Sequence, residues 1–178
     1  MLTALRELNL EKDTIVLYTT DHGEMLGEHG LWQKFMFYEP SVGVPLIVRA
    51  PGVTGAGGRS QTPVSQVQVL PTLLELCGLP VPAGLDAASM AADLREPSRT
   101  RDNTVYAEYN LRNPRAKYMI RSGDFKFNWY LSDTPELYNL REDPHEMKNL
   151  AALPAHRAKA EELKARIFAW NPGAKQGQ

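Results

Sequence analysis

An aspartate and a histidine stand side by side where a strand is expected to end. Residues 14–20 are a β-branched and aromatic run of strand length, and the run stops at Asp21, His22 and Gly23. In an open α/β sheet, ligands bind in the crevice beyond the carboxyl ends of the strands. A turn at Gly23 would let a carboxylate oxygen and an imidazole nitrogen face one cation. Such a donor pair suits a hard or borderline divalent ion.

Other polar residues lie in the loop between this run and a second apolar strand, expected at residues 45–48. Two ligands are too few to hold a divalent cation, so further ligands must come from elsewhere. The ammonium of Lys34 is suited to binding anion oxygens that a cation does not reach, and a solvated loop charge is the alternative. His29 either lines the same pocket or makes a hydrogen bond within the loop. Glu28 and Glu39 are interpreted as residues that brace the loop.

The order of these residues resembles that of one family. A strand is followed by DHGE, MLGEHGLW, a lysine, YEPS and VPLIV, which is similar to the second half of sulfatases of the alkaline phosphatase superfamily. The DHGE form is similar to the branch that contains choline-sulfatase-like enzymes and phosphonate monoester hydrolases. The resemblance implies that Asp21 and His22 are metal ligands. It also implies that Lys34 holds the sulfate or phosphate group, as a catalytic and substrate-binding residue, with His29 as a second substrate-binding candidate.

The resemblance further implies a set of cofactors. One divalent cation is expected, with calcium in first place and manganese or magnesium as alternatives. The family's nucleophile is a formylglycine made in a Cys(or Ser)-x-Pro-x-Arg motif, and the 178 residues contain no such motif. The one cysteine, Cys77, ends an apolar helical run and is predicted to be a buried, inert thiol. Gly43 and Gln68 depart from the family pattern, which has Arg and Asp at these places.

Length and composition favour a soluble chain with a core, at 178 residues and 43% apolar content. With 20 basic and 21 acidic residues there is no global field to attract nucleic acid or an acidic membrane. No apolar run reaches the roughly 20 residues of a membrane span, and no signal-peptide pattern is present. We therefore expect neither a nucleic-acid nor a membrane partner, and a cytoplasmic location is favoured.

The rest of the chain predicts two parts. Residues 79–103 are rich in Pro, Ala and Gly, and are interpreted as an irregular connector. Before it, the spacing of Leu2, Leu5 and Leu8 predicts a short helix, and residues 71–78 predict a second helix. The Gly-rich residues 54–59 are interpreted as a surface connection rather than a phosphate cradle. After it, alternating patterns predict antiparallel strands at 105–109, 117–121, 125–129 and 136–140, a helix starting at Asp143 and a final helix at 161–170.

The expected fold class is α/β. By resemblance, residues 1–103 are the C-terminal part of an alkaline-phosphatase-like α/β sandwich, and residues 104–178 a small antiparallel sheet with a C-terminal helix. A chain that begins inside an α-then-β unit is expected to leave sheet edges at residues 14–20 and 45–48 without partners. Self-association, or association with a missing N-terminal half, would cover them.

The working hypothesis is the C-terminal part of a metal-dependent sulfuric ester hydrolase, a sulfatase. Its substrate would be a small-molecule sulfate or phosphate ester, and the chain alone is expected to be inactive because it lacks the nucleophile motif. One alternative is a phosphodiester or phosphonate monoester hydrolase of the same superfamily. Another is a truncated interaction module without catalytic activity.

Overall fold

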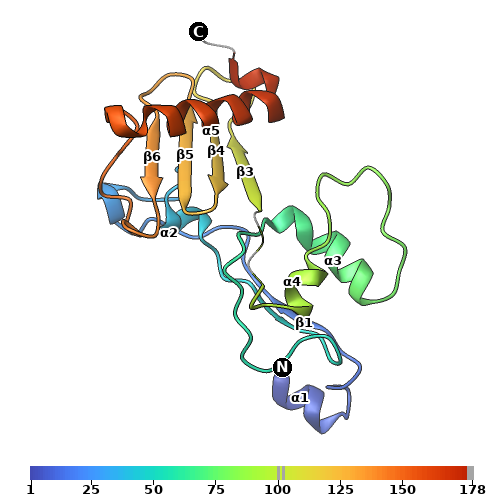
Figure 1. Cartoon of the computed structure of the whole chain (residues 1–178). Helices are drawn as coiled ribbons and strands as arrows, with labels where there is room; N and C mark the ends of the chain where they lie inside the picture. The colour runs from blue at the N-terminus through green and yellow to red at the C-terminus, as the bar shows by residue number, and fades with distance from the viewer. Residues whose placement is uncertain (100, 102, 176–178) are drawn as a thin grey trace. The chain divides into compact units, whose positions relative to one another are not determined.

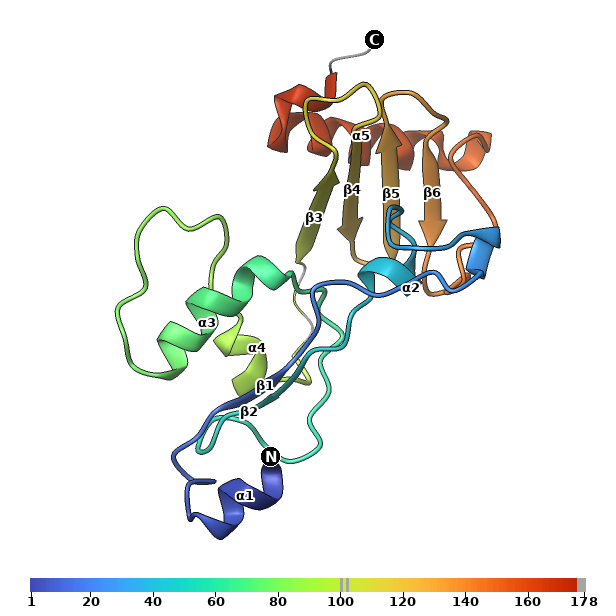
Figure 2. The same cartoon turned by 180° about the vertical axis from the view of Figure 1, so that it is seen from behind.

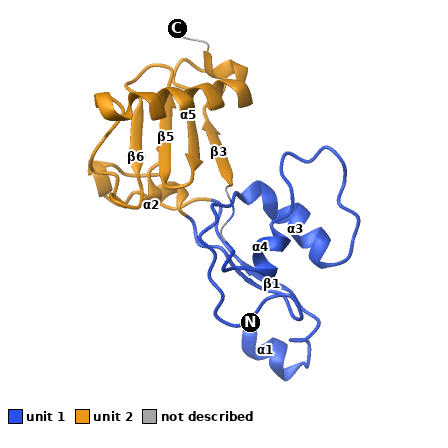
Figure 3. Cartoon of the chain, in the orientation of Figure 1, with its two compact units in different colours: residues 1–21, 44–101 blue, residues 22–43, 102–178 orange. Residues whose placement is uncertain are grey.

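The computed structural model describes residues 1–99, 101 and 103–175, which form two compact units (Figure 3). Unit 1 comprises residues 1–21 and 44–101, and unit 2 comprises residues 22–43 and 102–178. We call residues 22–43 the loop segment. The loop segment belongs to the same unit as the C-terminal sheet, although about sixty residues of unit 1 separate the two in sequence.

Unit 1 is built on a two-stranded antiparallel ladder in which Val16 faces Arg49 and Tyr18 faces Ile47. The ladder is shorter than the predicted run of residues 14–20, and its Tyr18 and Ile47 side chains are 61% and 62% exposed. The hydroxyl of Thr72 accepts a 2.9 Å hydrogen bond from the amide of Met90, which ties the two later helices together. The elements are α1 (Leu2–Glu7), β1 (Val16–Tyr18), β2 (Ile47–Arg49), η2 (Gln66–Gln68), α3 (Val69–Leu76) and α4 (Ala91–Arg95).

Unit 2 is a four-stranded antiparallel sheet in the order β3-β4-β5-β6. One long helix, α5, lies on one face of the sheet, and the loop segment lies on the other (Figures 1 and 2). The four predicted strands and the final helix are confirmed, with small shifts at their ends. The elements are η1 (Glu28–Gly30), α2 (Glu39–Val42), β3 (Thr104–Tyr109), β4 (Lys117–Ser122), β5 (Phe125–Tyr130), β6 (Glu136–Asn139), η3 (Pro154–His156), α5 (Arg157–Trp170) and η4 (Pro172–Lys175).

The two faces of this sheet have different cores. On the α5 face, Phe127 pairs with Ile120 and Leu137, and this apolar layer meets Leu163 and Ile167 of the helix. Because side chains alternate across a strand, the neighbours of Phe127 on β5 point to the other face. Those neighbours are a lysine and an asparagine, Lys126 and Asn128, and both are fully buried. The face beneath the loop segment is therefore a polar core.

The predicted irregular connector at residues 79–103 contains a helix, α4, and two further predictions about local structure are wrong. No helix starts at Asp143; its carboxylate instead accepts hydrogen bonds from the amides of Met147 and Lys148 at 3.1 and 2.8 Å, within a turn. Glu146 there has a left-handed backbone, φ 56°, which a continuing helix excludes. Cys77 is exposed rather than buried, because it caps the end of α3.

Among the residues that the structure describes, none of the helices has the length and apolar content to cross a bilayer.

Candidate functional site

Hydrogen bonds within the loop segment hold the backbone next to His22 against the end of that segment. The amide of Gly23 donates to the Ser41 carbonyl at 2.8 Å, and the amide of Glu24 donates to the Pro40 carbonyl at 3.0 Å. The Ser41 hydroxyl donates to the Lys34 carbonyl at 2.9 Å. Gly23 permits this approach, because a Cβ at its position would lie 1.9 Å from the Pro40 oxygen. The start, middle and end of the loop segment are thus brought together.

His22 and Lys34, twelve residues apart, meet directly in this arrangement. The Lys34 ammonium donates to Nε2 of His22, and Nδ1 of the same ring lies 2.7 Å from the Gly23 carbonyl. An ammonium has donors only, so Nε2 must be the acceptor and Nδ1 must hold the ring proton. The backbone carbonyl therefore fixes the tautomer whose lone pair is on Nε2, the atom to which the Lys34 ammonium donates.

The residues present fit part of a divalent-cation site. A neutral histidine whose Nδ1 proton is held by a carbonyl is the usual form of a metal-binding imidazole. Asp21, next to it in sequence, is exposed, and its Oδ1 accepts a 3.2 Å hydrogen bond from the Thr20 hydroxyl. Within residues 1–99, 101 and 103–175, no three His, Cys, Asp or Glu side chains form a group that could hold a metal ion by themselves.

His29 is placed by stacking. Its backbone is left-handed, with φ 53°, and its ring lies parallel to that of Tyr38 at 4.0 Å with an interplanar angle of 8°. The Tyr38 hydroxyl donates in turn to Glu136 of β6 at 2.6 Å. The sheet therefore fixes the position of the Tyr38 ring, on which the His29 ring stacks. The sequence pattern alone assigned no role to Tyr38 or Glu136.

Three tyrosines surround the Glu136 carboxylate in the polar core. Tyr38 and Tyr130 each donate to it at 2.6 Å, and the side-chain amide of Asn128 donates at 3.1 Å. Burial, followed by the proximity of Glu136, raises the pKa of Tyr38, Tyr130 and Tyr138 well above that of a free phenol. A phenolate next to a carboxylate in a buried site would be repelled, so these hydroxyls stay neutral donors.

Alkaline titration tests this cluster. A group whose pKa is raised on folding contributes stability below its unfolded pKa, about 10 for tyrosine, and that stability is lost as the pH rises further. We expect the protein to unfold in this alkaline range. Four of its seven phenols should ionise late because folding raises their pKa: those of Tyr38, Tyr118, Tyr130 and Tyr138. Ultraviolet absorbance of phenolate measures this, and Tyr38→Phe should remove one late phenol. Loss of all seven protons before unfolding would contradict it.

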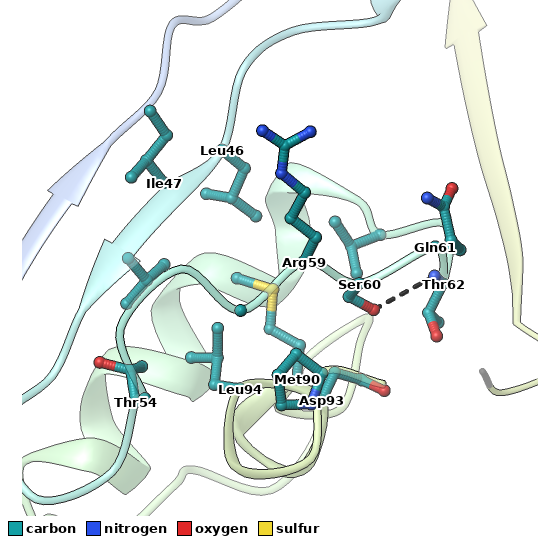
Figure 4. A pocket seen from close by; sticks show the side chains of 15 residues that line it. Leu46, Ile47, Thr54, Arg59, Ser60, Gln61, Thr62, Met90, Asp93 and Leu94 are labelled. Carbon is teal, nitrogen blue, oxygen red and sulfur yellow. Dashed lines mark hydrogen bonds between the residues drawn. The ribbon is translucent and has the colours of Figure 1, made fainter. Parts of the chain in front are cut away.

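Unit 1 holds a separate pocket of about 540 Å³ (Figure 4). In this view the apolar side chains of Leu46 and Ile47 lie on one side and those of Met90 and Leu94 on the other. The predicted Gly-rich connection at residues 54–59 contributes part of its wall. None of the residues predicted to bind a cation or an anion lines this pocket.

A comparison with known protein families decides the family of the chain. A family profile described as "N-sulphoglucosamine sulphohydrolase, C-terminal" matches residues 27–171, most of the 178 residues. The chain belongs to this sulfatase family. The match includes His29 and Lys34 of the loop segment and the whole of the four-stranded sheet.

Curated relatives of this sulfatase chain are named as sulfatases. It is 34% identical over 163 residues to arylsulfatase K of Bos taurus, covering 85% of this chain and 30% of that protein. It is 36% identical over 158 residues to choline-sulfatase of Rhizobium meliloti, covering 86% of this chain and 30% of that protein. The chain thus spans less than one third of the length of these relatives.

Solved structures agree with the sulfatase assignment. The chain superposes with a TM-score of 0.86 and 30% identity on a protein solved in complex with its substrate D-glucosamine-2-N,6-O-disulfate, over 99% of this chain and 38% of that one. A phosphonate monoester hydrolase from Silicibacter pomeroyi gives a TM-score of 0.81 at 27% identity, over 96% and 37%. The predicted fold class and the resemblance to the C-terminal part of sulfatases are both confirmed.

Proposed function

We propose that this chain supplies part of the centre of a metal-dependent sulfuric ester hydrolase. Asp21 and His22 are two ligands of one divalent cation, with calcium proposed first, and Lys34 binds the anionic group of the ester. The contact between the Lys34 ammonium and Nε2 of His22 supports this most directly, because it puts a cationic group at the atom that would bind a metal. The sulfatase names of the relatives support the reaction class.

The chemistry of each side chain follows from its charge. Asp21 and neutral His22 offer an oxygen and a nitrogen donor, and a cation bound there would polarise the ester and stabilise negative charge on it. Lys34 and that cation need the same lone pair of His22, so they exclude each other at Nε2. Once displaced, the flexible, exposed Lys34 side chain can bind oxygens of the ester and offset the charge that grows on them.

The rest of the centre is proposed to come from outside this chain. Two ligands do not complete the shell of a divalent ion, and the formylglycine motif is absent from these 178 residues. We therefore propose that the relatives' additional length corresponds to an N-terminal part that supplies the nucleophile and further ligands, and that this chain alone does not turn over sulfate esters. The exposed Tyr18 and Ile47 side chains of β1 and β2 are the proposed place of association.

A second candidate substrate class has its own support. The similarity to a phosphonate monoester hydrolase, at nearly the same TM-score, fits a chain whose Lys34 would bind a phosphonate as well as a sulfate. Both esters present negatively charged oxygens to an ammonium, so the choice between them depends on residues outside this site.

Calcium titration by calorimetry tests the proposed ligands. Because water must complete the shell around two protein ligands, we expect the chain to bind calcium weakly. Asp21→Asn and His22→Gln should weaken that binding by at least about tenfold, since even outer partners of metal ligands commonly cost that much. The matched controls are Asp86→Asn and His145→Gln, which change an exposed acid and an exposed histidine outside the loop segment in sequence. Equal affinities in all four variants would contradict the proposal and favour the non-catalytic interaction module.

A further inference from the structure

We propose that Lys126 of β5 is a positioning residue, which holds the loop segment through Glu39 so that His22 and Lys34 meet. The importance of Lys126 for catalysis depends on the function proposed above, whereas its effect on the position of the loop segment does not depend on that function. Lys126 lies in the C-terminal sheet, 87 residues from Glu39, and the sequence pattern alone assigned it no role.

The contacts of Lys126 are short and enclosed. Its ammonium lies 2.8 Å from Oε1 of Glu39 and 2.6 Å from Oε1 of Glu146, and the side chains of Lys126 and Glu146 are both 0% exposed. The other oxygen of Glu146 accepts a 2.6 Å hydrogen bond from the backbone amide of Glu39. One residue of the loop segment is therefore held at its side chain and at its backbone by two residues of the C-terminal region.

The charges in this cluster balance. Arg121 of β4 lies 3.8 Å from the second oxygen of Glu39, so two cations, Lys126 and Arg121, face two carboxylates, Glu39 and Glu146. Burial raises the pKa of Glu146, and the neighbouring Lys126 ammonium opposes that shift. Buried ion pairs add little net stability compared with an apolar core of the same volume, and their best-attested role is to fix one arrangement of the chain.

A short path connects this cluster to the site. Glu39 begins α2, and the next two residues of that helix are Pro40 and Ser41. Their carbonyls accept the hydrogen bonds from Glu24 and Gly23, the residues directly after His22. The Ser41 hydroxyl also holds the Lys34 carbonyl. A shift of Glu39 therefore moves the backbone partners of both His22 and Lys34.

Nuclear magnetic resonance of the whole chain tests this inference without added metal. The test variant is Lys126→Met with Glu146→Gln, which removes the ammonium without leaving a buried charge unpaired. We expect loss of the nuclear Overhauser contact between the His22 ring and the Lys34 side chain, and amide exchange of Gly23 and Glu24 faster by at least about tenfold. The exchange of Ile120 and Phe127 amides in the sheet should stay unchanged.

A matched control ion pair lies in unit 1. Arg95→Met with Glu75→Gln removes a 2.8 Å ion pair of unit 1 and should leave the His22–Lys34 contact and both loop-segment amides unchanged. The inference is overturned if the Lys126 variant keeps that contact, or if all sheet and loop amides speed up together, as a purely structural role predicts. Because no cation takes part, a calcium affinity that does not respond to Asp21→Asn and His22→Gln overturns the proposed function and leaves this result to stand by itself.

Discussion

Replacing Lys126 alone with methionine is expected to lower the free energy of unfolding by about 3–5 kcal/mol, the usual cost of leaving one partner of a buried ion pair unpaired. The Glu146 side chain is 0% exposed and lies 2.6 Å from the Lys126 ammonium, so no water is available to replace that cation. Urea denaturation of the chain measures the change.

Two further variants test the cause of that loss. Lys159→Met removes a lysine of similar length whose pair with Glu162 is exposed, at 38% and 46%, and should cost no more than about 1 kcal/mol. Adding Glu146→Gln to Lys126→Met should recover part of the loss, since the unpaired carboxylate is then gone. If Lys126→Met costs as little as Lys159→Met, the enclosed ion pair does not exist in solution.

Gly23→Ala is expected to separate His22 from Lys34 and to destabilise the chain by about 1–3 kcal/mol, the typical cost of overpacking a closed site. The new Cβ would lie 1.9 Å from the Pro40 carbonyl oxygen, and backbone atoms cannot yield as a flexible side chain would. The two amide–carbonyl hydrogen bonds that close the loop segment, from Gly23 and Glu24, must lengthen or break.

The matched control for this substitution is Gly55→Ala, because a Cβ at Gly55 meets no atom within 4 Å. Its unfolding free energy and calcium affinity should equal those of the unchanged protein. Gly23→Ala should weaken calcium binding along with stability, because His22 no longer keeps its tautomer and place. Full calcium affinity in a destabilised Gly23→Ala chain would show that closure of the loop segment does not prepare the site.

The loop segment contains proposed site residues and contacts the C-terminal sheet. It holds His22 and Lys34, two of the proposed site residues, and its tertiary partners are residues of the C-terminal region: Glu136 for Tyr38, and Lys126 and Glu146 for Glu39. The antiparallel sheet is thus a support for the site as well as a separately packed layer. Its apolar face packs α5, and its polar face holds the loop segment.

Periodic and local signals in the sequence were enough to locate most of the helices and strands of unit 2. Alternation located β3 to β6, and the spacing of apolar residues located α5. The ordered passage from DHGE to YEPS indicated the sulfatase family, which the family match confirms, and predicted His22 and Lys34 as site residues. The prediction that Glu39 braces the loop is confirmed by its contacts with Lys126 and Arg121. Local signals also misled: the pattern at Asp143 indicated a helix start, but its carboxylate closes a turn.

The contacts that hold the site join residues far apart in the sequence, and they are visible only in the folded chain. Lys126 looked like one of the polar residues of a half-exposed strand, because alternation tells which face a side chain takes but not what covers that face. Its partner Glu39 is 87 residues away, and an ion pair over such a separation leaves no periodic mark in a single sequence. Likewise, the tautomer of His22 follows from one carbonyl and one ammonium that meet only when the loop segment is closed.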